Sequence, residues 1–329
     1  EADELFGVLR TLRDEGKTVV LITHKLREIM AITDTVSVMR QGQVVATLQT
    51  AATSPEQLAE LMVGRRVLLR VDKGPANPGQ PLLEVEHLVV ADDRGVVRVK
   101  DVSFAVRGGE IVGIAGVAGN GQSELLEAIT GMRDRKSGTV RLAGRPLSLA
   151  GDDGARRARR AGLAHVPEDR QRMGLVVNFE EWENAILGYE YLPAYGGLFL
   201  DIAKARRAAE TDIRTFDIRP ANARLKTANF SGGNQQKIVL AREIGRDPDV
   251  LVVGQPTRGV DIGAIEFIHN QLIKLRDAGK AILLVSVELD EIRSLSDRIL
   301  VMFDGRIVGE ADPATATENE LGLMMAGIQ

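Results

Sequence analysis

The chain has 329 residues, of which 44% are apolar, enough for a substantial hydrophobic core in one large domain or two smaller ones. The formal net charge of −4 provides no positive field that would hold nucleic acid nonspecifically, so we expect no nucleic-acid partner. The absence of cysteine excludes disulfides and thiolate metal sites. The longest apolar runs, such as residues 250–253 and 281–287, have the length of strands and fall far short of the ~20 residues that span a bilayer.

The first predicted elements belong to an internal repeat. Residues 1–15 carry dispersed charges and no apolar central stretch, so we expect a helix there rather than a signal peptide. Residues 12–45 align without gaps with residues 275–308, and Gly16 pairs with Gly279. A duplication of such long period indicates two copies of one domain rather than a solenoid. Because only the end of the first copy is present, we expect the sequence to be a fragment of a longer tandem protein.

A linker is predicted between the two copies. Residues 71–81 contain three prolines and two glycines, which interrupt both helical and strand patterns. We therefore divide the chain into the tail of a first domain at 1–66, a linker at 67–81 and a second domain at 82–329.

The second domain contains a glycine-rich loop. Residues 82–106 predict short alternating strands around a turn at 92–95, the apolar run 111–115 predicts a buried strand, and residues 124–131 predict a helix. The loop between that strand and helix approaches G-x-x-x-x-G-K-[ST], in which backbone N–H groups cradle nucleotide phosphates, the lysine neutralises them and the hydroxyl binds magnesium. Gln122 stands in place of the lysine. The alternative is an ordinary glycine-rich turn. The nucleotide-binding candidates in this loop are Gly116, Gly119, Asn120, Gly121, Gln122, Ser123 and Glu124.

Strands and helices are predicted to alternate downstream of this loop. The arginine-rich stretch 151–160 predicts a solvated helical face rather than a nucleic-acid patch, and residues 201–214 predict an exposed, charged helix. The apolar runs 250–253 and 282–285 predict strands of a parallel sheet that is covered on both faces. The pattern as a whole predicts an α/β fold.

A second motif, FSGGNQQK at residues 230–237, precedes a helix predicted over 238–245. With the phosphate loop, it makes the chain resemble the ATP-binding cassette (ABC) superfamily, in particular the tandem ATPase subunits of bacterial simple-sugar and nucleoside importers, the nucleoside branch above all. The resemblance extends over essentially the whole chain. It implies a P-loop NTPase with a RecA-like parallel-sheet core, an antiparallel β subdomain and an α-helical subdomain, preceded by the tail of another cassette. The segments that carry it are GNGQSELLEAITG (119–131), VPEDRQRMGLV (166–176), FSGGNQQKIVLARE (230–243), QPTRGVDIGAIEFIH (255–269) and VELDEIRSLSDRI (287–299).

The resemblance implies a role for the second motif, the family's signature. In such proteins the start of the following helix presents N–H groups to the γ-phosphate of an ATP molecule held by the opposite cassette. A simple helix cap is the alternative. Asp261 matches the family's D-loop, which communicates between the two sites, and a helix N-cap is its alternative interpretation. The signature residues are Ser231, Gly232, Gly233, Asn234 and Gln235.

The resemblance also implies that the second cassette does not hydrolyse ATP. Where the family has D-E-P-T, this chain has Gly254 and Gln255, which lack the carboxylates that bind magnesium and polarise the attacking water. Val287 occupies the position of the switch histidine, whereas its repeat partner in the first cassette is His24. Together with Gln122, these changes leave little rate enhancement, although nucleotide can still bind through the N–H groups of the loop.

ATP and Mg²⁺ are the cofactors that the resemblance implies. Ser123 would be a weak magnesium ligand, and Glu168, at the position of the family's Q-loop glutamine, could contact a cation or a membrane subunit. His24 is expected directly after a strand, against the γ-phosphate held by the first cassette. Residues 170–188, including Trp182, are expected to form a docking surface for the membrane subunit, with local core packing as the alternative for Trp182.

The leading functional hypothesis is an importer motor, in which ATP closes two cassettes and hydrolysis reopens them. Its expected partners are integral membrane permease subunits, a periplasmic or lipoprotein substrate-binding protein and the missing first cassette of the same chain. The expected location is the cytoplasmic face of the cell membrane, and this chain by itself is expected to lack ATPase activity. One alternative, a soluble tandem ATPase acting on ribosomes or DNA, is disfavoured because the chain lacks a long charged linker. The other is a non-catalytic regulatory or scaffold module that binds nucleotide.

Overall fold

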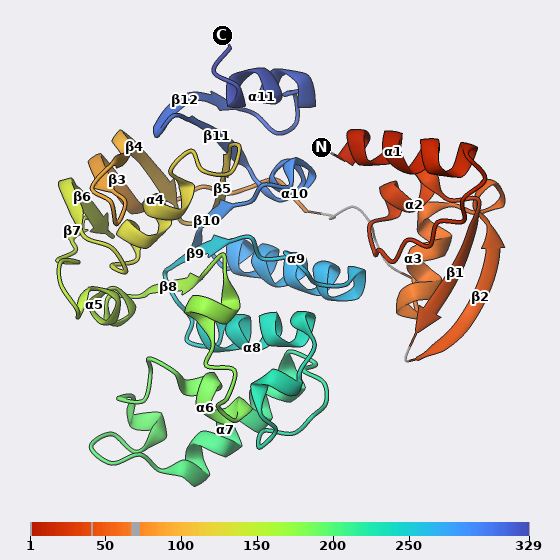
Figure 1. The fold of residues 1–329 in the computed structure, drawn as a ribbon. Helices are drawn as coiled ribbons and strands as arrows, with labels where there is room; N and C mark the ends of the chain where they lie inside the picture. Colours follow the sequence, from red (N-terminus) through yellow and green to blue (C-terminus); the bar gives the residue numbers. More distant parts are fainter. Residues whose placement is uncertain (1, 41, 67–72, 329) are drawn as a thin grey trace. The chain divides into compact units, whose positions relative to one another are not determined.

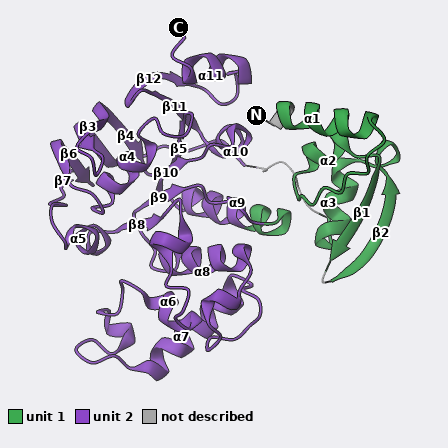
Figure 2. Ribbon diagram, viewed as in Figure 1, with its two compact units in different colours: residues 1–71, 261–267 green, residues 72–260, 268–329 purple. Residues whose placement is uncertain are grey.

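A computed structural model describes residues 2–40, 42–66 and 73–328 (Figure 1). The chain divides into two compact units, residues 1–71 with 261–267 and residues 72–260 with 268–329 (Figure 2). Residues 67–72 of the predicted linker lie outside the described residues. No helix of the described ranges combines the length and the apolarity needed to cross a bilayer.

The first unit is built from short helices and one β-hairpin. Helix α3 begins after Ser54, whose hydroxyl accepts a hydrogen bond from the backbone N–H of Gln57, and it ends at Val63, with Gly64 as its left-handed C-cap. Ile29, Val38 and Leu58 form a small buried cluster. The helix expected over residues 1–15 is confirmed. The elements are α1 (Ala2–Asp14), α2 (Leu26–Ile32), β1 (Thr35–Arg40), β2 (Gln43–Gln49), η1 (Thr50–Ala52) and α3 (Pro55–Val63).

The strand expected before His24 is absent, so that expectation was wrong. Residues 17–25 form neither helix nor strand, and Val20 and Ile22 are 84% and 95% exposed. Their repeat partners form strand β10 (Ala281–Val285), which is hydrogen-bonded to a neighbouring strand on each side. Among its described residues the first unit has only the β1–β2 pair, so no neighbouring strand is present to satisfy the backbone groups of this segment.

The second unit is centred on a six-stranded sheet in the order β12-β11-β5-β10-β9-β8. All its strands run parallel except β12, which pairs antiparallel with β11. Every residue of β5, β8, β9 and β10 is buried, which explains their continuous apolar runs and confirms the predicted covered sheet. Besides β10, the strands are β5 (Glu110–Ala115), β8 (Leu163–Val166), β9 (Val250–Gly254), β11 (Arg298–Phe303) and β12 (Arg306–Ala311).

A four-stranded antiparallel sheet in the order β4-β3-β6-β7 packs on the same core. The turn predicted at 92–95 is present, because the carboxylate of Asp92 accepts hydrogen bonds from the backbone N–H groups of Arg94 and Val96. Leu83 and Val102 of this sheet share one buried cluster with Val252 of the parallel sheet. The strands are β3 (Pro81–Ala91), β4 (Val97–Arg107), β6 (Arg135–Leu142) and β7 (Arg145–Pro146).

A helical insert separates β8 from β9. Asp201 caps α7 by accepting a hydrogen bond from the backbone N–H of Lys204, and the charged helix predicted over 201–214 is confirmed. Helices α6, α7 and α8 pack against one another. The helices of the second unit are α4 (Gln122–Ile129), α5 (Gly154–Arg160), η2 (Arg170–Gly174), α6 (Glu181–Ile186), η3 (Pro193–Tyr195), α7 (Ile202–Thr215), η4 (Thr227–Asn229), α8 (Gly232–Ile244), α9 (Ile262–Asp277), α10 (Leu289–Leu295) and α11 (Glu318–Met325).

Trp182 belongs to this helical core and is not part of an exposed docking surface. Its side chain is only 7% exposed, and its indole N–H donates a hydrogen bond of 2.6 Å to Glu180. The guanidinium of Arg206 lies 5.2 Å from the ring centroid. The expectation of a docking role for Trp182 was therefore wrong, and the alternative of local packing is confirmed.

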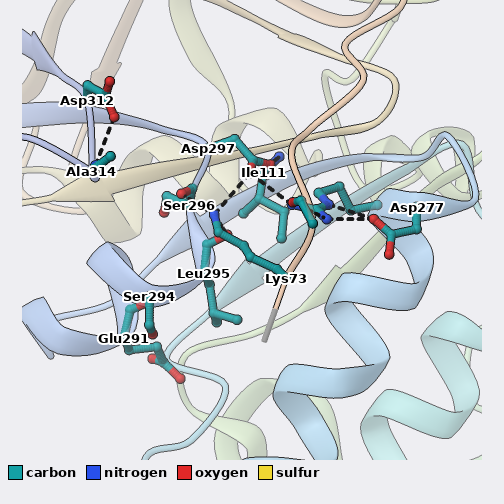
Figure 3. Close-up of polar contacts among 12 residues, drawn as sticks. Lys73, Ile111, Asp277, Glu291, Ser294, Leu295, Ser296, Asp297, Asp312 and Ala314 are labelled. Carbon is teal, nitrogen blue, oxygen red and sulfur yellow. Dashed lines mark hydrogen bonds and ion pairs between the residues drawn. The ribbon is translucent and has the colours of Figure 1, made fainter. Parts of the chain in front are cut away.

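Residues 73 and 74 of the predicted linker are fixed to the second unit (Figure 3). The ammonium of Lys73 donates hydrogen bonds to the carbonyl oxygens of Leu295 and Ser296 and lies 2.9 Å from the carboxylate of Asp297. Arg276 donates to the same carboxylate and to the carbonyl oxygen of Gly74. Residues 73 and 74 are therefore part of the folded second unit.

Candidate functional site

Four neighbouring parallel strands bring the predicted site residues of the second unit to one edge of the sheet. Strand β5 leads into the phosphate loop, β8 ends two residues before Glu168, β9 ends at Gly254, and β10 ends two residues before Val287. The carboxyl ends of parallel strands are where open α/β sheets bind ligands. The sheet therefore gathers at one edge residues that lie far apart in the sequence.

The phosphate loop is shaped by its glycines. Gly121 has a φ of 100° and precedes helix α4, and a Cβ atom there would lie 2.4 Å from the carbonyl oxygen of Arg98. Only glycine fits this position, on grounds of both conformation and space. Ser123 and Glu124 lie in the first turn of α4, where unpaired backbone N–H groups make an anion-binding site.

Asn120 ties the loop to the turn between β11 and β12. Its side-chain oxygen accepts a hydrogen bond of 2.8 Å from the backbone N–H of Asp304, and its carbonyl oxygen accepts one from Gly305. Its amide N–H₂ donates back to Val117 within the loop. Sequence reasoning placed Asn120 in the loop but missed this role, because Asp304 lies 184 residues away and no local pattern marks it.

Gln122 folds back onto its own loop. Its side chain is only 6% exposed and its amide donates a hydrogen bond of 3.1 Å to the carbonyl oxygen of Val117. The loop from Gly116 to Glu124 contains no lysine or arginine. Phosphate binding here would therefore rely on backbone N–H groups and on neighbouring segments.

Glu168 occupies the space beside the end of β9. Its carboxylate accepts a hydrogen bond from the hydroxyl of Ser123. A Cβ atom at Gly254 would lie 2.4 Å from the Cγ atom of Glu168 and 2.9 Å from a methyl group of Leu126. The side chain of Glu168 thus fills the volume that a side chain at position 254 would need.

Gln255 and Val287 are held together at the ends of β9 and β10. The side-chain oxygen of Gln255 accepts a hydrogen bond of 3.4 Å from the backbone N–H of Val287, and its own backbone N–H donates to the carbonyl oxygen of Val285. Gln255 is 8% exposed. A carboxamide in this position can orient a water molecule but cannot take its proton.

The signature residues form the start of helix α8. Ser231 caps this helix, since its hydroxyl accepts hydrogen bonds from the backbone N–H and the side-chain amide of Asn234. A Cβ atom at Gly232 would lie 2.9 Å from the carbonyl oxygen of Gly259, so a glycine is needed for this close approach. Gly233 is buried in the first turn, and Gln235 accepts a hydrogen bond of 3.0 Å from the side chain of Gln171.

Two further candidates lie outside the group at the strand ends. Asp261 caps helix α9 through a hydrogen bond of 3.0 Å from the backbone N–H of Ala264, which confirms the N-cap interpretation. His24 is half-buried in the first unit, next to Thr23, whose hydroxyl donates to Glu28. The structure thus brings together the phosphate loop, Glu168, Gly254, Gln255 and Val287, and it places the signature separately, on α8.

A divalent cation would find only part of its ligand set here. Within the described ranges, no group of three or more His, Cys, Asp or Glu side chains is arranged to hold a metal ion. The hydroxyl of Ser123 and the carboxylate of Glu168 are oxygen ligands of the kind that Mg²⁺ prefers, and they already lie in contact. These residues fit Mg²⁺ provided that nucleotide phosphates and water complete the coordination.

Comparisons with known proteins agree with this geometry. Residues 99–258 match the family model described as "ABC transporter". The chain is 45% identical to the nucleoside import ATP-binding protein NupA of Lactococcus lactis, and the match covers 99% of this chain and 64% of that protein. It is 47% identical to the guanosine import ATP-binding protein NupO of Bacillus subtilis, with the same coverage, and 39% identical to the ribose import ATP-binding protein RbsA of Chromobacterium violaceum. The chain thus spans less than two thirds of the length of these relatives.

Solved structures share the fold. The post-hydrolysis dimer of the ATP-binding cassette MJ0796, bound to ADP and Pi, superposes with a TM-score of 0.61 at 23% sequence identity, covering 70% of this chain and 99% of that one. The ABC fold with its parallel and antiparallel sheets, expected from the sequence, is confirmed. The chain contains an ABC transporter ATP-binding domain with the P-loop NTPase fold, and it is homologous to the ATP-binding proteins of nucleoside and sugar importers.

Proposed function

We propose that this chain is the C-terminal part of a tandem-cassette ATP-binding subunit that energises the membrane import of a simple sugar or nucleoside. Its second cassette binds ATP without hydrolysing it and lends its signature motif to the hydrolytic site of the first cassette. One observation carries the proposal: the strand ends present a shaped phosphate loop beside Gln122, Gly254, Gln255 and Val287, none of which provides a charge or a base.

The tandem arrangement is supported by the internal repeat and by the relatives, whose additional length could hold the remainder of a first cassette. In such an assembly the permease subunits span the membrane, a periplasmic or lipoprotein substrate-binding protein delivers the cargo, and this subunit is peripheral on the cytoplasmic face. Nucleoside or sugar cargo is inferred from what the relatives are named for.

Different residues of the second cassette contact the phosphates, the cation and the solvent around the bound nucleotide. Backbone N–H groups at the start of α4 hold phosphate oxygens, and Asn120 fixes the loop to the β11–β12 turn by accepting hydrogen bonds from Asp304 and Gly305. Ser123 and Glu168 would hold Mg²⁺, which would supply charge neutralisation for the phosphates. Gln255 orients solvent without removing a proton, so the bound nucleotide remains intact.

The exposed N-terminal residues of α8 contribute to the ATP site of the first cassette. Ser231 is exposed. Its hydroxyl accepts a hydrogen bond from one backbone N–H of the first turn, and the other N–H groups of this turn point out of the end of the helix. In the family arrangement, these groups meet the γ-phosphate on the first cassette, where His24 provides the switch histidine.

The test is steady-state ATPase activity of the tandem protein with its permease. We expect Ser231→Arg and His24→Ala to abolish turnover, because each removes a part of the one hydrolytic site, whereas Gln122→Ala leaves turnover nearly unchanged. Ser231→Thr is the matched control, since it keeps a capping hydroxyl and is expected to retain most of the activity. Near-normal turnover of the Ser231→Arg protein would contradict the assignment.

A regulatory module without a first cassette is the second candidate, and the presence of a complete nucleotide-binding fold within residues 82–329 favours it. The intact mass of the native polypeptide decides between the two. A mass larger by most of a cassette supports the importer subunit, and a mass equal to this chain supports the regulatory module.

A further inference from the structure

We propose that Glu181, the first residue of α6, is a pH-dependent switch in the helical insert. When it is protonated, it keeps α6 packed on residues 223–228, the segment that leads into the signature, and when it is ionised, it releases that segment. Glu181 belongs to none of the nucleotide-binding groups described above. The switch itself needs no nucleotide, whereas its effect on turnover rests on the proposed contribution of Ser231 to the hydrolytic site.

Glu181 is a buried carboxyl group without a partner. Its side chain has no exposed surface, and neither oxygen has a hydrogen-bond partner among the residues that the structure describes. An ionised carboxylate there would lose its hydration without gaining a counter-charge, so the packed arrangement favours the protonated form. Burial, with a smaller contribution from the charge of Asp212, accordingly raises the pKa of Glu181 to about 8.

The cations around Glu181 have other partners. Arg206 pairs with the carboxylate at the N-cap of α6, Arg242 with its neighbour in sequence on α8, and Arg246 with a backbone carbonyl oxygen of α6. Asp212 adds a second acidic group, and burial raises its pKa to about 6. The titratable and charged groups on the elements around Glu181 are Glu180, Glu183, Tyr189, Tyr195, Arg206, Asp212, Arg224, Lys226, Arg242, Glu243 and Arg246.

The backbone of α6 is hydrogen-bonded to the segment before the signature. The N–H of Glu181 donates a bond of 3.0 Å to the carbonyl oxygen of Leu225, and the N–H of Trp182 donates one of 3.0 Å to that of Ala223. The start of α6 therefore cannot move away from its neighbours without breaking its pairing with residues 223–225.

Thr227 carries this contact to the signature. It is fully buried, and its hydroxyl accepts a hydrogen bond of 2.8 Å from the side-chain amide of Asn184 on α6. Its carbonyl oxygen accepts one of 3.1 Å from the side chain of Gln235, a signature residue, and another from the N–H of Phe230. One buried residue thus joins α6, the segment before the signature and the first turns of α8.

Loss of the proton changes the balance at this contact. The charge on Glu181 regains water only if the first turn of α6 separates from its neighbours, which breaks the bonds to residues 223 and 225. The closed form keeps the proton up to a pKa of about 8, whereas the solvated group has its ordinary pKa of 4.5. Opening should therefore become about 10-fold more favourable for each unit of pH from about 5 to 8, and level off above this range.

The experiment is hydrogen exchange of the 329-residue chain as a function of pH, with rates corrected for the intrinsic pH dependence of exchange. We expect the protection of the amides of Glu181 and Trp182 to fall by about 100-fold between pH 5.5 and pH 7.5. In the Glu181→Gln protein, which keeps the size of the side chain but cannot ionise, their protection should not depend on pH. Helix α3 of the first unit is the internal control and should exchange equally in both proteins.

Two further variants test the assignment. Glu210→Gln, an exposed carboxylate on α7, should keep the full pH dependence. Asp212→Asn removes the neighbouring acidic group, so it should keep the dependence but make it level off at a lower pH. Circular dichroism verifies that each variant folds.

Two outcomes would overturn the proposal. Protection at Glu181 and Trp182 that is independent of pH, or that changes equally in Glu181→Gln, excludes the switch. A loss of protection confined to α6, with the amides of Thr227 and Phe230 unchanged, excludes its link to the signature. Both results come from the chain alone, so they are independent of the hydrolytic role of the signature, which Ser231→Arg tests in the tandem protein.

Discussion

Glu181, at the first residue of α6, is a buried carboxyl group in the helical insert. Its side chain has no exposed surface, and neither of its oxygens has a hydrogen-bond partner among the described residues. Burial, with a smaller contribution from the carboxylate of Asp212, raises the pKa of Glu181 to about 8. Burial likewise raises the pKa of Asp212, to about 6. The two groups hold protons in the folded protein at pH values where they are ionised in the unfolded chain.

This raised pKa predicts a loss of stability as the pH rises. Because the folded pKa of Glu181 exceeds its unfolded value, its stabilising contribution is complete below about pH 4.5 and is lost as the pH rises toward 8. We expect Glu181→Gln to raise the free energy of unfolding at pH 8.5, because glutamine carries no charge that burial would penalise. Each pKa unit corresponds to about 1.4 kcal/mol, and the expected gain is a few times that amount. At pH 5 the gain should be much smaller.

Urea unfolding at the two pH values measures this difference. Glu210→Gln, an exposed carboxylate on α7, is the control and should change stability by less than about 0.5 kcal/mol at either pH. A gain for Glu181→Gln that is equal at pH 5 and pH 8.5 would show that the carboxyl does not titrate as described.

At the scale of elements, Asp297 joins three segments of the second unit. Its carboxylate accepts hydrogen bonds from Lys73 in the predicted linker, from Arg276 at the end of α9 and from the backbone N–H of Ile111 in β5. Arg276 is only 1% exposed. Burial lowers the pKa of Lys73, and the charge of Asp297 opposes this effect. The carboxylate of Asp297 is therefore a counter-charge shared by two cations, and Asp277 is a second counter-charge for Arg276 (Figure 3).

Asp297→Asn should destabilise the protein by about 1–3 kcal/mol, because it removes the charged partner of Lys73 and one of the two carboxylates that pair with the buried guanidinium of Arg276, the other being Asp277. The repeat provides a matched control. Asp34 is the aligned residue of the first unit and is exposed, so Asp34→Asn should cost less than about 0.5 kcal/mol. Thermal and urea unfolding of the two variants measure the difference, and equal costs would contradict the junction role of Asp297.

The elements also show which features sequence patterns can predict. The apolar runs at 111–115, 250–253 and 282–285 predicted strands correctly, because strands buried on both faces read as continuous apolar segments. The same pattern failed at residues 17–25, since a strand also needs neighbouring strands that the pattern does not contain. Local composition thus predicts an element only where its partners are present.

The sequence predicted which residues belong to the candidate site but not which contacts they make. Motif spacing identified the phosphate loop and the substituted positions Gly254, Gln255 and Val287. It could not predict that Glu168 fills the space beside Gly254, or that Asn120 is bonded to Asp304, because both contacts join segments that are distant in sequence. Trp182 was assigned to a surface because a lone tryptophan carries no pattern that distinguishes packing from docking.

At the scale of the whole molecule, the two units differ in the elements that they contain. The second has a phosphate loop, a signature and a complete parallel sheet, whereas the described part of the first has a hairpin and short helices. Asp261 and the first residues of α9, up to Phe267, group with the first unit, where Ile262 packs with Ala59. The central claim therefore concerns the second unit: it binds ATP and does not consume it.

The most direct test of this claim is the chemical state of the nucleotide that the chain retains. The purified 329-residue protein is incubated with ATP and Mg²⁺, free nucleotide is removed by rapid gel filtration, and the bound nucleotide is extracted and separated by chromatography. We expect about one nucleotide per chain, recovered as intact ATP, with no phosphate released above a protein-free control. Recovery as ADP with released phosphate, or the absence of any bound nucleotide, would contradict it.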